Sequence, residues 1–257
     1  MSTDPSPIHN KSCELHEDHT GKWLTRSGEY QDWKSGSTRL LWIHGIPGSG
    51  KTVLASFVIE DIKDCCRTSS PSDTGWAYYY CYFGRQHDET PHLLRWVINQ
   101  LCRQSTYIPS ELIELHNQGG QPKTADLIKV LSVALRRFQH VHVVLDALDE
   151  SLKRQNLLDM MIQFASEDAF KKIKVLALSR KEIDIERSLG EFSDTMSLSN
   201  FLVDEDIQIY VQRTLRTDRK FRQWPASLTA DIERALVKGA KGMYVLMKIG
   251  IEMLPSG

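Results

Sequence analysis

The sequence lacks an excess of charge of either sign. Its 257 residues carry 32 basic and 33 acidic side chains, which gives a formal net charge of −1. Proteins that bind nucleic acid or anionic membrane surfaces through electrostatics usually present a strong positive field. The near balance gives no reason to expect either kind of partner, and we predict no nucleic-acid partner.

A long apolar run is also missing. The first 19 residues are polar and do not contain the apolar core of a secretory signal peptide. The most apolar stretch, 242–254, is too short to cross a bilayer and contains Lys248 and Glu252. We therefore expect no membrane span and a cytoplasmic location.

Cysteine is scarce, and the cysteines do not form a CxxC pair. They are Cys13, Cys65, Cys66, Cys81 and Cys102. An odd set without such a pair favours reduced thiols in an intracellular protein. The spacing of Cys13, His16 and His19 is C-x2-H-x2-H, which would supply three metal ligands. No fourth ligand is close in the sequence, so this pattern alone does not predict a zinc site.

Short apolar runs alternate with segments of helical periodicity. The expected strands are 39–44, 76–83, 141–146, 173–178 and 196–198. The expected helices are 20–33, 53–64, 91–103, 124–138, 156–164, 203–215 and 229–254, the last interrupted by Gly239 and Gly242. This alternation predicts an α/β fold with a mostly parallel five-stranded sheet flanked by helices, followed by a small helical C-terminal part.

Three segments are expected along the chain. Residues 1–38 are predicted to be a leader and a short helix, with the polar stretch up to about His19 poorly ordered. Residues 39–200 are predicted to form the α/β core, and residues 201–257 a helical extension.

One octamer matches the pattern G-x-x-x-x-G-K-[ST], the P-loop. It consists of Gly45, Ile46, Pro47, Gly48, Ser49, Gly50, Lys51 and Thr52. Glycines let the backbone wrap around phosphates, and successive N–H groups make an anion nest at the start of a helix. We expect Lys51 to reach the β- and γ-phosphates and the Thr52 hydroxyl to ligate magnesium. A chance match in a glycine-containing turn is the alternative, but a buried strand before it and a helix after it favour the P-loop.

A second group of candidate residues follows the apolar strand 141–146. Asp146 ends that strand, where the crevice of an open parallel sheet binds ligands, and it is the candidate magnesium partner. Asp149 and Glu150 follow within one turn, and either is placed to orient or deprotonate a water. The alternative is a solvated acidic loop. Because the strand 76–83 lies between the two site strands in sequence, we expect one extra strand between them in the sheet.

Arg180 ends the next expected strand. An arginine at this position is a candidate for sensing the γ-phosphate and neutralising charge as that phosphate departs. An ordinary surface arginine is the alternative.

With these motifs placed, the sequence resembles the NACHT group of P-loop NTPases, which are signalling switches. The resemblance rests first on Asp146-Ala147-Leu148-Asp149-Glu150 and on Ser179-Arg180. More narrowly, it resembles the fungal nephrocystin-3-like P-loop domains of NOD-like receptor proteins. That match rests on five further segments: 20–24, 41–45, 80–83 followed by Asp88-Glu89, 97–102 and 242–245.

The resemblance implies a core that holds nucleotide in a resting state and exchanges it on activation. It also implies Mg²⁺ as cofactor, slow hydrolysis, and partners that are other proteins or further copies of the same core. The family's N-terminal effector, winged helix and C-terminal repeats find no match here, so we expect a fragment or a short relative.

Several functions remain open at this point. The first is a slow NTP-dependent switch, and the second is a catalytically inactive nucleotide-binding scaffold for protein–protein interaction. A small-molecule kinase is disfavoured because no arginine-rich lid segment is found. The guanine-reading motif [NT]KxD is missing as well, which leans towards ATP over GTP.

Overall fold

A five-stranded parallel sheet forms the centre of the fold. The computed structural model describes residues 4–68, 74–84, 87–198 and 200–255. Its strands are β1 (Leu40–His44), β2 (Thr74–Tyr80), β3 (His140–Asp146), β4 (Ile173–Ser179) and β5 (Asp194–Ser197). They lie in the order β2-β3-β4-β1-β5, and every neighbouring pair is parallel. The predicted sheet is therefore confirmed.

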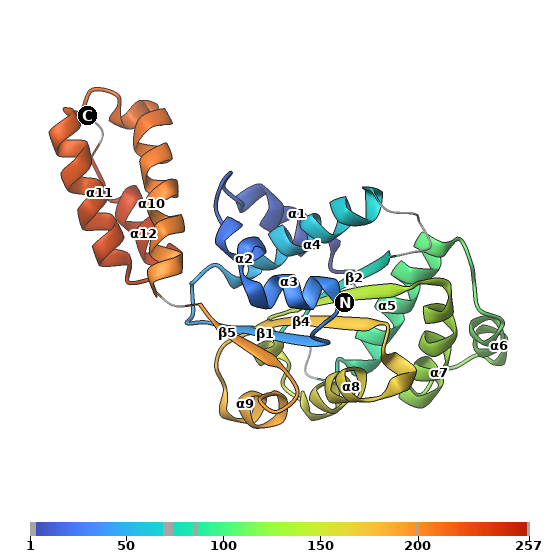
Figure 1. The fold of residues 1–257 in the computed structure, drawn as a ribbon. Helices are drawn as coiled ribbons and strands as arrows, with labels where there is room; N and C mark the ends of the chain where they lie inside the picture. The colour runs from blue at the N-terminus through green and yellow to red at the C-terminus, as the bar shows by residue number, and fades with distance from the viewer. Residues whose placement is uncertain (1–3, 69–73, 85–86, 199, 256–257) are drawn as a thin grey trace.

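Helices cover both faces of the sheet (Figure 1). They are α1 (Ser6–Leu15), α2 (Lys22–Arg26), α3 (Gly28–Ser35), α4 (Lys51–Thr68), α5 (Thr90–Ser105), α6 (Ser110–Gln118), α7 (Thr124–Ala134), α8 (Gln155–Ser166), α9 (Ile183–Leu189), α10 (Asn200–Thr217), α11 (Ala226–Ala240) and α12 (Tyr244–Glu252). Successive side chains of a strand point to opposite faces, and β1 shows the result. Leu40 and Trp42 join a core with α5, α7, α8 and α9, whereas Leu41 and Ile43 join one with α3, α4 and α10.

The N-terminal segment is not the poorly ordered leader that its polar composition suggests. Residues Ser6–Leu15 form helix α1, which packs on α4. The two buried residues of α1 are polar: His9 is 3% exposed and Ser12 is 4% exposed. The His9 imidazole lies 4.6 Å from the Tyr78 ring of β2. An interface built from hydrogen-bonded polar groups gives no apolar periodicity, and for that reason the composition was misleading.

The expected helix over 20–33 is in fact two helices. Ser27 has an extended backbone and its side chain accepts a hydrogen bond from the Tyr30 N–H, so it ends α2 and caps α3. The strand predicted over 76–83 ends at Tyr80, and Phe83 beyond it is 61% exposed. Helices α6 and α9 were not predicted. The Ser, Pro, Asp and Gly residues at 68–75 predict a loop before β2, and its residues 69–73 lie outside the described residues.

The C-terminal helices α10, α11 and α12 pack on one another beside the sheet (Figure 1). Lys241 and Gly242, with φ of 48° and 75°, break the expected final helix into α11 and α12. Gly239, also expected as an interruption, lies inside α11. The predicted boundaries at residues 38 and 200 remain a prediction.

The strand that separates the two site strands is not the one expected. One strand does lie between β1 and β3, as predicted, but it is β4. Strand β2, which comes between them in sequence, pairs with β3 on its outer side. Position in the sequence therefore did not give the position in the sheet. Both site strands end at the same edge of the sheet because all strands are parallel.

Candidate functional site

The loop between β1 and α4 has the backbone shape that its glycines predict. Gly48 and Gly50 have φ of 73° and 87°, a region that side chains with a Cβ rarely adopt. The crowding around them adds a second restriction: a Cβ on Gly50 would lie 3.1 Å from the Tyr244 ring. Helix α4 begins directly at Lys51. Its N-terminal N–H groups therefore point towards the loop, as in an anion site.

Lys51 lies against the loop that precedes it. Its ammonium donates to the carbonyl oxygens of Gly45 and Ile46, each at 2.8 Å. Burial lowers the pKa of Lys51, while Asp149 and Asp146 act in the opposite direction. The amine is therefore held among the acidic groups of the site, within the same cavity.

Asp146 is the most deeply buried acid of the site. It ends β3, is 2% exposed, and burial raises its pKa to about 6. The Thr52 hydroxyl, the Ala147 N–H and the Lys51 ammonium favour the ionised form but do not outweigh burial. Within the described part of the chain, no group reaches either carboxylate oxygen in good hydrogen-bond geometry. A buried carboxylate with unsatisfied oxygens is suited to a hard cation such as Mg²⁺.

The residue after Asp146 has an unusual backbone. Ala147 adopts the left-handed conformation, with φ 57° and ψ 41°, before the short helical turn Leu148–Glu150. The Glu150 N–H then donates to the Ala147 carbonyl at 2.8 Å. This turn brings the carboxylates of Asp149 and Glu150 back to the edge of the sheet. A β-branched side chain at this position would be strained, because the left-handed region is unfavourable for such residues.

We expect Ala147→Val to destabilise the fold by about 1–3 kcal/mol, since a β-branched residue is strained at positive φ. Ala147→Gly is the matched control, and it is expected to be neutral or stabilising by up to about 1 kcal/mol. Urea unfolding of the two variants measures both effects. A valine variant as stable as the wild type would show that the turn relaxes without cost.

Asp149 and Arg180 form a pair across the ends of β3 and β4. The Arg180 backbone N–H donates to Asp149 Oδ1 at 2.9 Å, and its Nε lies 3.2 Å from Oδ2. The Asp149 side chain is 8% exposed and that of Arg180 is 51% exposed. Ser179 stabilises the strand end, because its hydroxyl accepts from Trp42 Nε1 and donates to the Arg180 carbonyl. Both sequence-predicted residues reach the site, with the Asp149 carboxylate engaged by Arg180.

Glu150 is the second acid of the turn. Burial raises its pKa, with Asp149 and Glu89 acting in the same direction. A backbone hydrogen bond from Phe83 and the charge of Arg180 act in the opposite direction. A carboxylate with a raised pKa is a better proton acceptor than an ordinary surface acid.

A cavity of about 300 Å³ gathers most of the predicted site residues at the carboxyl edge of the sheet. They are Pro47, Gly48, Gly50, Lys51, Thr52, Asp146, Asp149, Glu150 and Arg180. The other three P-loop residues lie around it: Gly45 and Ile46 accept from Lys51, and Ser49 lines a neighbouring cavity. The size is at the lower end of that usual for small-molecule sites.

Helix α12 forms one wall of this cavity, which the sequence reasoning did not anticipate. The Tyr244 N–H donates to the Gly48 carbonyl at 2.8 Å, so the first residue of α12 is bonded to the loop. Val245 and Lys248 also line the cavity, as does Leu15 at the end of α1. The segment 242–245 is one of the segments that carry the family resemblance, and that match is the signal of its importance in the sequence. Its role depends on tertiary packing that periodicity does not reveal.

A second, narrower cavity of about 80 Å³ adjoins the loop. Its walls include Gly50, Leu54, Leu198 and Tyr244. Asp206 of α10 closes it, because its carboxylate accepts from the Gly21 N–H and from Trp23 Nε1, both at 2.9 Å. This contact joins the N-terminal segment to the C-terminal helices beside the loop.

Comparison with known proteins gives a family and a fold. The family model described as "Nephrocystin 3, N-terminal" matches residues 19–180. The vegetative incompatibility protein HET-E-1 of Podospora anserina is 26% identical over 200 residues, which cover 74% of this chain. The matched region spans only 14% of HET-E-1.

Solved structures support the same architecture. The Aeropyrum pernix ORC2 protein, solved as ADPNP–ADP complexes, superposes with a TM-score of 0.52 at 15% identity, covering 93% of this chain and 64% of that one. Drosophila ORC bound to DNA gives 0.51 at 12% identity, covering 96% and 63%. At these identities the likeness shows the fold alone. No helix in the described ranges is long and apolar enough to cross a membrane.

Proposed function

This chain belongs to the nephrocystin 3, N-terminal, family of P-loop domains, and from that premise we propose that it binds ATP with Mg²⁺, hydrolyses it slowly and acts as the core of a signalling switch. The observation that carries the proposal is the cavity of about 300 Å³. It brings Lys51, Thr52, Asp146 and Glu150 together where parallel strands end, the usual ligand position of such sheets.

The phosphate-binding part of the proposal rests on the loop and on Lys51. Backbone N–H groups of the loop and of the first turn of α4 hold the β- and γ-phosphates. The Lys51 ammonium exchanges the carbonyls of Gly45 and Ile46 for phosphate oxygens, which are stronger acceptors because they are charged. The Thr52 hydroxyl and the Asp146 carboxylate would hold Mg²⁺, which would supply positive charge against the phosphates.

We place the nucleoside on the side of the loop where the narrower cavity lies; at about 80 Å³ this cavity is smaller than a usual small-molecule site and would have to widen to admit it. Leu54, Leu198, Val203 and Tyr244 give it apolar walls, which suit a flat aromatic base. Gly50 lines both cavities. One nucleotide can therefore place its phosphates on the loop and its base on the side of the narrow cavity. The missing guanine motif favours ATP, and GTP is the alternative that a competition assay would reveal.

For hydrolysis we assign the general base to Glu150. The neighbouring acid, Asp149, already accepts from Arg180, and its role is then to position that arginine near the departing phosphate. Arg180 is half exposed, so its guanidinium has room to turn into the cavity. Burial raises the pKa of Glu150, which makes it a better proton acceptor than an ordinary surface acid.

Glu150→Gln is expected to lower the rate of phosphate release about 10²–10⁴-fold, the usual contribution of a general base, with nearly unchanged affinity for ATP. Phosphate release and ATP binding are measured on the same preparations. Glu191→Gln, at an exposed position outside the cavity, is the matched control. Equal rates in wild type and Glu150→Gln would contradict the assignment. A wild type that binds ATP without releasing phosphate would instead favour the inactive scaffold.

The switch itself is proposed from the contact between α12 and the loop. The Tyr244 N–H donates to the Gly48 carbonyl. A change in the loop conformation on nucleotide exchange therefore changes the position of the C-terminal helices. The partners we propose are other proteins or a second copy of this core, in the cytoplasm. HET-E-1 is named for vegetative incompatibility, and a role in such a response is proposed here by likeness only. Drosophila ORC was solved bound to DNA, but the net charge of −1 gives no reason to propose a DNA partner for this chain.

A further inference from the structure

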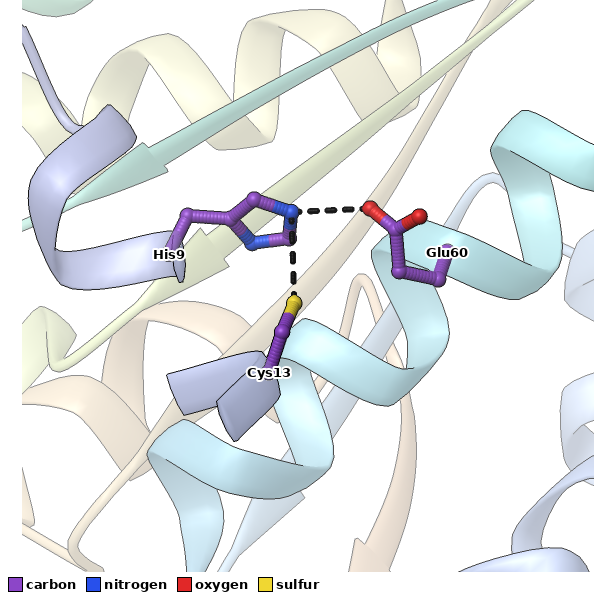
Figure 2. A group of neighbouring side chains, drawn as sticks. All are labelled: His9, Cys13 and Glu60. Carbon is purple, nitrogen blue, oxygen red and sulfur yellow. Dashed lines mark hydrogen bonds and ion pairs between the residues drawn. The ribbon is translucent and has the colours of Figure 1, made fainter. Parts of the chain in front are cut away.

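Three side chains with metal-binding atoms converge between α1 and α4, on the sheet face that carries these helices. They are His9 and Cys13, one turn apart on α1, and Glu60 of α4 (Figure 2). Their ligand atoms, one imidazole nitrogen, one sulfur and one carboxylate oxygen, all lie within 4.8 Å of one another. The nucleotide site proposed above uses none of them.

The distances suit one tetrahedral ion. A zinc ion with Zn–N near 2.0–2.1 Å and Zn–S near 2.3 Å places those two ligand atoms about 3.6 Å apart. His9 Nε2 lies 3.7 Å from Cys13 Sγ. In the same geometry a ligand nitrogen and a carboxylate oxygen are about 3.3 Å apart. His9 Nε2 lies 2.9 Å from Glu60 Oε1, which is slightly shorter. A small outward shift of the half-exposed Glu60 side chain therefore brings the nitrogen–oxygen distance to that value.

The imidazole is oriented for ligation. His9 Nδ1 lies 3.1 Å from the Tyr80 hydroxyl, which leaves Nε2 directed at Cys13 and Glu60. Metal-binding histidines usually have such a partner on the second nitrogen, since it sets the tautomer and the ring orientation. Burial lowers the pKa of His9, although Glu60 acts in the opposite direction, and the neutral imidazole is the form that binds a metal.

A positive charge already occupies this position. The Lys63 ammonium lies 3.0 Å from His9 Nε2 and 2.7 Å from Glu60 Oε1. It also lies 4.9 Å from the centre of the Trp76 ring and 5.0 Å from that of Tyr78. The cluster therefore attracts a cation, and the aromatic rings offer the ammonium a place to remain when another cation takes over its contacts.

We propose that His9, Cys13 and Glu60 form a binding site for a zinc-like divalent cation, which displaces Lys63 from the imidazole and carboxylate. One nitrogen, one thiolate and one carboxylate suit Zn²⁺ better than Mg²⁺ or Ca²⁺. The thiol proton leaves to solvent as the Cys13 sulfur bonds the metal, and water completes the four ligands. The ion would fix α1 to α4, the helix that begins at Lys51.

This ligand set differs from the C-x2-H-x2-H spacing in the sequence. His16 Nε2 lies 3.2 Å from the Thr20 carbonyl oxygen, and its ring stacks on Phe57. His19 Nδ1 lies 2.9 Å from Lys22 Nζ. Only Cys13 of that pattern takes part, and His9 one helical turn earlier together with Glu60 replaces the two other histidines.

The test is a titration of the whole chain with Co²⁺ and with Zn²⁺, read by absorption and calorimetry. Co²⁺ is expected to bind at one equivalent, with a thiolate-to-cobalt charge-transfer band that Zn²⁺ abolishes. Cys13→Ser should remove the band, whereas Cys102→Ser, at a cysteine outside the cluster, should keep it. No band in the wild type, or the same band in Cys13→Ser, would overturn the proposal.

Two further variants locate the ion and do not depend on the folding of the cysteine variant. Glu60→Gln, at a half-exposed side chain, should keep the charge-transfer band but weaken Zn²⁺ binding about tenfold or more, a loss of about 1.4 kcal/mol. Lys63→Met removes the competing charge and should tighten Zn²⁺ binding by about the same factor. Affinities unchanged in both variants would place any bound zinc elsewhere and overturn the proposal.

Discussion

Lys51→Ala is expected to weaken binding of Mg·ATP about ten- to hundredfold. A hydrogen bond to a charged group contributes about 1.5–3 kcal/mol, and each 1.4 kcal/mol is tenfold in affinity. The fold should tolerate the change, because the hydrogen bonds of the Lys51 ammonium go to two carbonyls of its own loop, those of Gly45 and Ile46. The loss is therefore expected in binding and not in stability.

Calorimetric titration with Mg·ATP measures the effect, and urea unfolding without nucleotide checks the fold. Lys238→Ala, at an exposed position on α11, is the matched control for the loss of one positive charge. If both variants bind Mg·ATP as tightly as the wild type, the phosphates do not lie on this loop.

Asp146→Asn is expected to have two opposite effects. Without ligand, the ionised carboxylate is costly: its pKa rises from 3.8 to about 6 in the fold, which corresponds to about 3 kcal/mol of lost stability at pH 8. The neutral amide should recover about 1–3 kcal/mol of this. With Mg·ATP present, the wild type should be the more stable of the two, because the amide is a weaker ligand for Mg²⁺ than a carboxylate.

The pH dependence distinguishes this explanation from simple repacking. A raised folded-state pKa means that the penalty is absent below pH 3.8, grows between 3.8 and about 6, and is fully present above that. The advantage of Asp146→Asn in urea should therefore be large at pH 8 and small near pH 4.5. Asp149→Asn is the contrasting control, since its carboxylate accepts from Arg180 and its loss should destabilise. An Asp146→Asn variant less stable than the wild type at pH 8 would show that the carboxylate is well solvated or paired.

The sequence predicted the features that depend on local pattern. The apolar run ending in Asp146 and the octamer Gly45–Thr52 appear as a buried strand end and a loop before α4. The carboxyl ends of parallel strands lie at one edge of the sheet. The residues that follow β1 and β3 therefore line one cavity, although they are far apart in the sequence. The role of each residue in that cavity stays a prediction.

Features that depend on tertiary contacts were not predictable in the same way. Helix α1 buries polar groups such as His9, so hydropathy indicated a disordered leader. The contact of Tyr244 with Gly48 joins residues almost 200 positions apart, and no periodicity signals it. The pairing of Asp149 with Arg180 joins two side chains that follow neighbouring strands, β3 and β4, and no periodicity along either strand signals it.

The central claim, that this site holds a nucleotide, is tested most directly by mass analysis of what the protein retains. Wild type and Lys51→Ala are loaded with excess ATP and Mg²⁺, desalted in the same way and denatured, and the released nucleotide is identified and counted. We expect about one equivalent of adenine nucleotide, as ATP or ADP, from the wild type and much less from Lys51→Ala. No retained nucleotide from the wild type, or equal amounts from both, would contradict the account.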